Sequence, residues 1–309
     1  MTAEETDLLI GEAVTGGVTA QVAEIDGIAM SALCAEVDQP RAVVVAVHGG
    51  ATTSQYFDCP GRPSMSLLRI GAALGFTALA VDRPGYGESA PHAGTFADPD
   101  HRVDTCYRTV DAMLGSRPRG AGVFLLAHSA GCDLALRMAA DERGAHLLGL
   151  ELAGTGVRKH PDAERRIAQM SVTRSRAAIR EMLWEPGYLY PPEIFGGKSI
   201  SVTGPDYEAA VVRDWPPAFP ELARRVRVPV RFSHGEFERV WRSDAAAMAE
   251  IRQMFSAAPR FVTNVQSEAG HNLSLGFGAA AYHLGTLSFV EECAVLRRAE
   301  NPAPRPSPE

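Results

Sequence analysis

The 309-residue sequence lacks several features that mark specialised classes of protein. It contains no run approaching the roughly 20 consecutive apolar residues that a helix needs to cross a bilayer. The acidic first stretch, MTAEETDLLIGEAVTGG, lacks the basic start and apolar core of a signal peptide. The net charge is −7. This disfavours a nucleic-acid or anionic-membrane partner, because a protein binds such partners through a basic face. We therefore expect a cytoplasmic protein with a small-molecule substrate, no nucleic-acid partner and no membrane partner.

Cysteines are few and widely spaced. No pair has C-x-x-C spacing, and no Cys/His cluster has the spacing of zinc ligands. An odd, dispersed set in a chain of this length indicates reduced thiols in a reducing compartment. We expect no bound metal and no cofactor. The oligomeric state stays open, with a homodimer as one expectation.

The sequence does contain an alternation of strand and helix patterns. Residues 17–37 suit an antiparallel strand pair. Continuous apolar runs such as RAVVVAVHGG (41–50) and GVFLLAHS (122–129) predict strands buried on both faces. Stretches with helical spacing, such as SMSLLRIGAALG (64–75), lie between such runs. This order predicts the α/β class, with a mostly parallel sheet covered on both faces by helices.

The alternation stops between residues 157 and 227. This stretch of about 70 residues holds helical segments and the aromatic, proline-rich passage EPGYLYPPEIFGGK, and it is short and irregular for a second domain. We expect a core domain formed by residues 1–156 and 228–298, with a helical cap or lid inserted at 157–227. The proline-rich end, 299–309, is expected to be a disordered tail.

One serine stands at a corner between a predicted strand and a predicted helix, in AHSAGC (127–132). A sharp turn of this kind lifts the hydroxyl of Ser129 clear of the sheet, and it requires small residues two positions before and after, here Ala127 and Gly131. A serine hydroxyl becomes a nucleophile only with a base and with donors for the oxyanion. Because serine is also a common helix cap, the partners of Ser129 must decide its role.

The base and acid should follow in chain order, after later strands. His271 lies just past the last predicted strand, in SEAGHNLSLG, and is the candidate base. The preceding strand exits into HGEFERVW, which offers Glu236 and Glu238 as the acid that orients the histidine.

Two backbone N–H groups are expected to form the oxyanion hole. One is that of Ala130, the residue after the serine. The other comes from the glycine loop after VVVAVHGG, where Gly50 and Ala51 are equal candidates because glycine lets the backbone approach a substrate closely.

Taken in order, these strings resemble the α/β-hydrolase family over residues 18–298. VHGG is similar to its oxyanion loop, DRPGYGES (82–89) to its D-x-x-G-x-G-x-S turn, AHSAGC to its nucleophile elbow, and AGH to its histidine loop. The resemblance implies an eight-stranded, mostly parallel sheet, and it puts the acid three residues after Gly235, at Glu238. Ala127 in place of glycine and Glu238 in place of aspartate are departures from the family pattern.

The family resemblance also places the inserted segment where members carry a lid. Its aromatic residues would suit an apolar roof over the site, although aromatics also form ordinary cores. The candidate substrate-binding residues are Tyr56, Phe57, Trp184, Tyr188 and Trp215.

These features together predict a serine hydrolase. We expect it to cleave an ester, lactone or related acyl bond of a small to medium apolar substrate, through a triad of Ser129, His271 and Glu238 and an acyl-enzyme. The fold alone leaves two alternatives. One is a non-hydrolytic or carbon–carbon-bond-processing enzyme, similar to a biosynthetic cyclase or thioesterase, and the other is a ligand-binding member of the fold.

Overall fold

The protein, described here by a computed structural model for residues 17–173 and 181–300, is built on one eight-stranded sheet. The strands are β1 (Thr19–Ile25), β2 (Ile28–Ala35), β3 (Val43–Val47), β4 (Thr77–Val81), β5 (Val123–His128), β6 (Gly149–Ala153), β7 (Val230–Gly235) and β8 (Phe261–Gln266). Their spatial order is β1-β2-β4-β3-β5-β6-β7-β8. The first two pairings, β1–β2 and β2–β4, are antiparallel, and every later pairing is parallel. The predicted sheet is therefore confirmed.

Helices connect the strands. The α-helices are α2 (Leu67–Ala73), α3 (Pro99–Leu114), α4 (Gly131–Ala140), α5 (Pro161–Thr173), α7 (Glu208–Arg225), α8 (Ala245–Met254) and α9 (Ala279–Glu300). Short 3-10 helices are η1 (Ser54–Phe57), η2 (Pro63–Met65), η3 (Gly87–Phe96), η4 (Glu142–His146), η5 (Gly187–Leu189) and η6 (Phe195–Gly197). No helix among the described residues is long and apolar enough to span a membrane.

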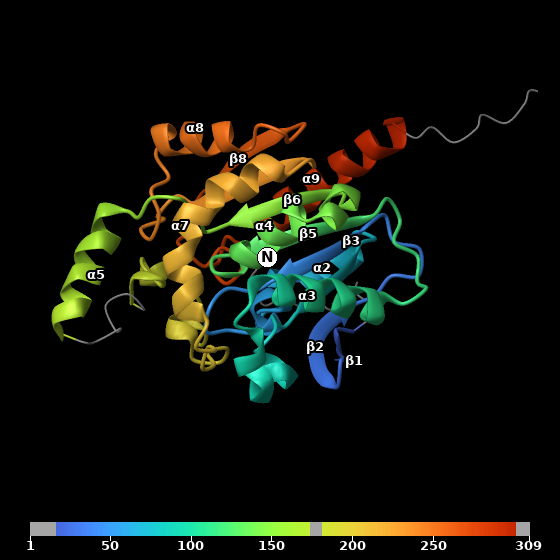
Figure 1. The fold of residues 1–309 in the computed structure, drawn as a ribbon, viewed down its shortest axis with the longest axis horizontal. Coiled ribbons are helices and arrows are strands. Elements are labelled where there is room, and N and C mark those ends of the chain that lie inside the picture. The colour runs from blue at the N-terminus through green and yellow to red at the C-terminus, as the bar shows by residue number, and fades with distance from the viewer. Residues whose placement is uncertain (1–16, 174–180, 301–309) are drawn as a thin grey trace, which may run out of the picture.

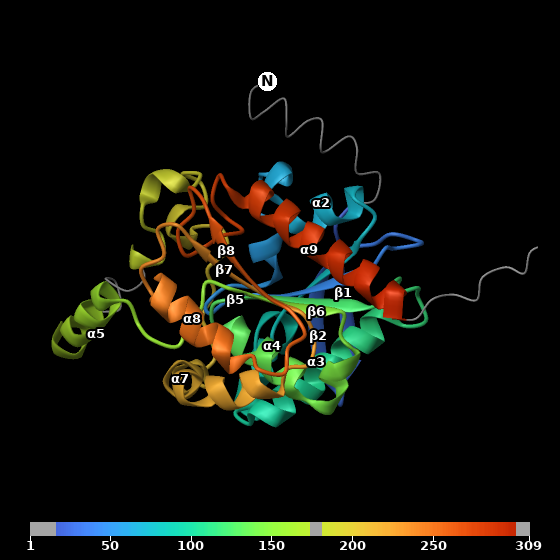
Figure 2. The ribbon, with the colours of Figure 1, turned by 90° about the horizontal axis from the view of Figure 1, so that it is seen from above.

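The two faces of the sheet bury different hydrophobic clusters. In β3, Val43 and Val45 belong to a cluster with α3, α4, α7 and α8, whereas Val44 and Ala46 belong to one with α2 and α9. This follows from the period of two in a strand, whose successive side chains point to opposite faces. Figure 2 shows α2 and α9 on one side of the sheet and α3, α4 and α7 on the other. Burial on both faces explains why the parallel strands are continuous apolar runs.

The inserted segment, residues 157–227, lies between β6 and β7 and contains α5, η5, η6 and α7. The long helix α7 is a feature that the sequence does not suggest, because Pro216, Pro217 and Pro220 lie inside it. Figure 1 shows that α7 bends, as expected where proline removes helix hydrogen bonds. Packing holds it in place, since Trp215 donates from Nε1 to the carbonyl of Gly156 at 2.9 Å. Its action as a lid stays a prediction.

Two further expectations concern the chain ends and the cysteines. The last helix, α9, reaches Glu300, and residues 301–309 of the predicted tail lie outside the described residues.

All five cysteines lie in the described part of the chain, where they are buried and form no disulfide.

Candidate active site

Ser129 occupies a strained turn between β5 and α4. Its φ is +51°, in the left-handed region that non-glycine residues seldom adopt. Gly131 makes the turn possible, because a Cβ at that position would lie 2.3 Å from the His48 carbonyl oxygen. Ala127, the departure from the family pattern, is fully buried in β5. The hydroxyl of Ser129 is thus held at the carboxyl edge of the sheet, at the start of a helix.

Ser129, His271 and Glu238 form one hydrogen-bonded chain. His271 Nε2 lies 3.0 Å from Ser129 Oγ, and His271 Nδ1 lies 2.9 Å from Glu238 Oε2. An ionised carboxylate only accepts hydrogen bonds, so the proton of the neutral ring is on Nδ1. Nε2 is then free to accept the hydroxyl proton of Ser129. This is the geometry that a serine nucleophile requires.

Glu238 is ionised although it is buried. Its Oε1 accepts from the backbone N–H of Val240 at 2.7 Å and of Trp241 at 3.3 Å. Burial alone would raise the pKa of Glu238, but the charge and hydrogen bond of His271 and these two N–H groups outweigh it, and the pKa is lowered to about 2. The alternative acid, Glu236, is exposed and accepts instead from the backbone N–H of Glu268 at 3.1 Å. Of these two glutamates, Glu238 is the one that is hydrogen-bonded to His271.

The oxyanion-hole candidates differ in what their N–H groups contact. The N–H of Ala51 donates to Tyr86 Oη at 3.2 Å. In the described part of the chain, the N–H groups of Gly50 and Ala130 have no hydrogen-bond acceptor. Gly50 is exposed and Ala130 is half-buried. The structure therefore leaves Gly50, rather than Ala51, as the available partner of Ala130.

His128, which the sequence did not single out, contacts the backbone of the loop that carries His271. Its Nε2 lies 2.9 Å from the backbone oxygen of His271, and its ring stacks on Tyr56 with centroids 4.4 Å apart. Burial, followed by the nearby His271, lowers the pKa of His128 to about 3, so the ring is neutral. It can therefore donate from Nε2 and hold the loop that carries His271.

The predicted substrate-binding aromatics are mostly buried. Four of them are buried in packed clusters, and Tyr188 alone is largely exposed. Those four are Tyr56, Phe57, Trp184 and Trp215. A side chain buried in the protein core offers little surface to a ligand, so their contact with substrate stays a prediction.

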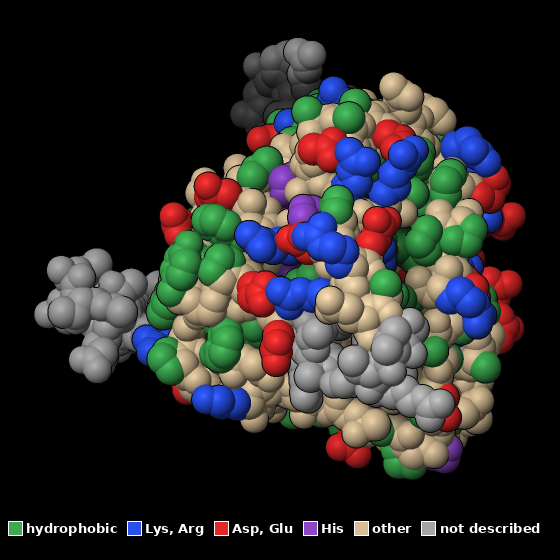
Figure 3. Space-filling model, turned by 90° about the vertical axis from the view of Figure 1, so that its left-hand side faces the viewer, with side chains coloured by type: hydrophobic (Ala, Val, Ile, Leu, Met, Phe, Trp, Pro, Cys, Tyr) green, Lys and Arg blue, Asp and Glu red, His purple; other side chains and the backbone are tan. Residues whose placement is uncertain are grey.

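The face that carries the site is charged and held by ion pairs. The arrow of β6 points to the left in Figure 1, and Figure 3 looks onto that side, where Lys and Arg alternate with Asp and Glu. Arg239, next to Glu238, pairs with Asp162 of α5 at 3.5 Å. Lys159 places its Nζ 3.2 Å from the centre of the Trp241 ring, and burial lowers its pKa to about 8. The inserted segment is thereby tied to the loop that carries the acid.

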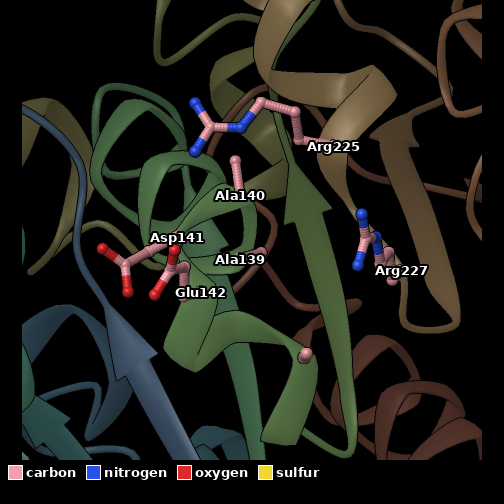
Figure 4. Close-up of a pocket in the computed structure, with 7 residues that line it drawn as sticks. Ala139, Ala140, Asp141, Glu142, Arg225 and Arg227 are labelled. Carbon is pink, nitrogen blue, oxygen red and sulfur yellow. The ribbon is translucent and has the colours of Figure 1, made fainter.

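A cavity of about 160 Å³ lies at the far end of α4 from Ser129. Figure 4 shows Asp141 and Glu142 at the end of α4, with Arg225 and Arg227 on the side of α7. Asp141 is already paired with Arg143 at 2.8 Å. Within residues 17–173 and 181–300, no group of three or more His, Cys, Asp or Glu side chains could hold a metal ion. The hydrogen-bonded chain of Ser129, His271 and Glu238 makes their region the candidate for catalysis.

Known proteins resemble the chain chiefly in fold. A family model described as serine aminopeptidase, S33, matches residues 38–188. No curated protein sequence matches the chain. A soluble variant of monoglyceride lipase from Saccharomyces cerevisiae superposes with a TM-score of 0.66 at 14% identity, covering 90% of this chain and 96% of its own.

Two other solved structures agree with this likeness. E-2-(acetamidomethylene)succinate hydrolase has a TM-score of 0.64 at 16% identity and covers 89% of this chain and 100% of its own. A thermostable carboxyl esterase from Bacillus coagulans has a TM-score of 0.62 at 18% identity, with 91% and 100% covered. At such identities the likeness establishes the fold.

Proposed function

We propose that this chain, which has the fold of the α/β-hydrolases, is a serine hydrolase that cleaves carboxylic esters through an acyl-enzyme. The observation that carries the proposal is the continuous chain from Ser129 Oγ through the ring of His271 to Glu238. The substrate we propose is a small to medium, largely apolar ester or lactone.

The reaction follows from which atoms can give and take protons. Ser129 Oγ attacks the carbonyl carbon while His271 Nε2 takes the hydroxyl proton, and Glu238 stabilises the imidazolium that forms. The N–H groups of Gly50 and Ala130 hold the negative oxygen. The tetrahedral intermediate collapses, and His271 gives its proton to the departing alcohol. Water then attacks the acyl-enzyme, loses a proton to His271, and releases the acid and Ser129.

Active-site labelling tests the proposal directly. Folded wild-type protein is incubated with a fluorophosphonate, and the adduct is detected by intact mass and located by peptide mapping. We expect one adduct on Ser129, which is absent from Ser129→Ala and strongly reduced in His271→Gln. The matched control is His234→Gln, which removes another buried histidine at the end of β7. It should leave labelling unchanged.

A substrate panel then addresses the bond that is cleaved. It contains p-nitrophenyl esters of increasing acyl length, a lactone, a thioester and an aminoacyl p-nitroanilide, the last because the matching family model is described as an aminopeptidase. We expect the esters to be cleaved with the highest kcat/KM. Absence of an adduct in folded wild type, or an adduct that persists in Ser129→Ala, would contradict the proposal.

A further inference from the structure

The carbonyl of Gly49 is held by two donors. His48 Nδ1 lies 2.8 Å from this oxygen and Arg83 Nη2 lies 2.9 Å from it. The backbone N–H of Arg83 donates to His48 Nε2 at 3.0 Å, which requires the ring proton to be on Nδ1. Both groups on the Gly49 oxygen are therefore donors.

This carbonyl shares a peptide unit with the N–H of Gly50. In a trans peptide the C=O and N–H of one unit lie in a plane and point in opposite directions. Fixing the Gly49 oxygen on one side therefore fixes the Gly50 N–H on the other. That N–H is the available oxyanion donor of the glycine loop, and the positive charge of Arg83 polarises the same peptide toward stronger donation.

Arg83 is itself almost fully buried, with 2% of its surface exposed. Its guanidinium lies over the ring of Tyr86, 4.7 Å from the centroid. A buried cation requires a counter-charge. That charge comes from Glu208 at the start of α7, whose Oε1 lies 2.6 Å from Arg83 Nη2.

Glu208 stands beside Gly50, which in turn lies next to Ala130. A Cβ placed on Gly50 would lie 3.1 Å from Glu208 Oε2 and 3.7 Å from the Cβ of Ala130. A negative charge at this place repels the oxyanion unless it is neutralised, because charges a few ångströms apart interact strongly near a low-dielectric surface. Arg83 provides that neutralisation.

We propose that Arg83 is a positioning residue for the oxyanion hole, which aims the Gly50 N–H through the Gly49 carbonyl and neutralises Glu208 beside the hole. The inference rests on the proposed serine hydrolase function. It also links the inserted segment to catalysis, because α7 supplies the charge that Arg83 must balance.

A double-mutant cycle tests both parts of this role. The variants are Arg83→Met, Glu208→Gln and the double variant, assayed with an ester and with the matching thionoester, whose sulfur accepts hydrogen bonds weakly. In Arg83→Met we expect kcat for the ester to fall by about 10² to 10³, as for loss of an oxyanion-hole donor. KM should stay within about threefold, because the interaction acts in the transition state.

The ratio of ester to thionoester turnover distinguishes a misaimed Gly50 N–H from a loss of protein stability. A fraction of unfolded protein lowers both rates equally, whereas a misaimed Gly50 N–H lowers the ester rate more. We expect this ratio to fall in Arg83→Met and to stay unchanged in Glu208→Gln. The double variant should regain roughly tenfold in kcat over Arg83→Met, by removing the unbalanced carboxylate, and should not reach wild type.

One control and one substitute variant keep the test decisive. Arg231→Met removes another buried arginine, one that pairs with Glu151 at 3.0 Å, and should lower the melting temperature without changing the ratio. If Arg83→Met does not fold, Arg83→Lys takes its place in the cycle, with a smaller loss in the same direction. An unchanged ratio refutes the inference.

Full recovery in the double variant also refutes it, because Arg83 would then serve only as a counter-ion. The proposed function fails separately. A wild type that cleaves no ester and takes no fluorophosphonate refutes both, whereas an active wild type with an unchanged ratio in Arg83→Met refutes this inference alone.

Discussion

Replacing Glu238 by Gln removes the charge that, in the proposed mechanism, stabilises the His271 imidazolium. The pKa of Glu238 is lowered from 4.5 to about 2, although burial by itself raises it. A change of this size corresponds to about 3 kcal/mol, or a few hundredfold in rate if it is fully lost in the transition state. The amide also favours the wrong ring tautomer, so we expect kcat to fall by about 300-fold to 10⁴-fold.

The assay is steady-state turnover of the best ester, with melting temperature as a check of folding. Glu236→Gln is the matched control, because it removes an exposed carboxylate two residues away that accepts from the backbone N–H of Glu268. It should retain kcat within about twofold, as a surface substitution away from the site should. A Glu238→Gln enzyme within tenfold of wild type, or an equal loss in Glu236→Gln, would refute the assignment of the acid.

Three further substitutions address stability. Gly131→Ala places a Cβ 2.3 Å from the His48 carbonyl oxygen and should cost about 2–4 kcal/mol in chemical denaturation, since the backbone must move. Arg231→Met leaves Glu151 buried without its partner and should cost about 3–5 kcal/mol, recovered in part by Glu151→Gln. The pKa of Lys159 is lowered from 10.5 to about 8 by burial, so Lys159→Met should be more stable than wild type below pH 8. That advantage should fade between pH 8 and pH 10.5, as the wild-type ammonium loses its proton.

Each of these expectations has a clear contrary result. Unchanged stability of Gly131→Ala would mean that the turn relaxes without cost. A stable Arg231→Met would mean that water reaches Glu151. A difference between wild type and Lys159→Met that does not change from pH 7 to pH 11 would mean that burial is not what lowers this pKa.

The sheet and the contacts among Ser129, His271 and Glu238 could be predicted because their signals are local. A strand buried on both faces must be a continuous apolar run, and a tight elbow must have small residues around its serine. The order of serine, acid and base along the chain then selected His271. The choice of Glu238 over Glu236 rested on the family pattern, and the contact with His271 agrees with it.

Features that depend on distant contacts were not predictable. The availability of Gly50 rather than Ala51 depends on the hydroxyl of Tyr86, which comes from a different loop. The helix α7 forms although it contains three prolines, because packing of residues such as Phe219 outweighs local propensity. Nothing near Glu208 in the sequence indicates that it lies beside the oxyanion loop. Its place follows only from how α7 packs.

The hydrogen bond between His271 and Ser129 joins residues 142 positions apart. Closing so long a loop costs entropy that is recovered only when the later strands join the sheet. A chain emerging from the ribosome therefore displays Ser129 long before it has His271, the base that we propose for it. Until β7, β8 and the loop after β8 are in place, the hydroxyl of Ser129 is no more reactive than that of any other serine. If the proposed function holds, the newly made polypeptide is thus inert toward esters until the chain as far as His271 has been made and folded.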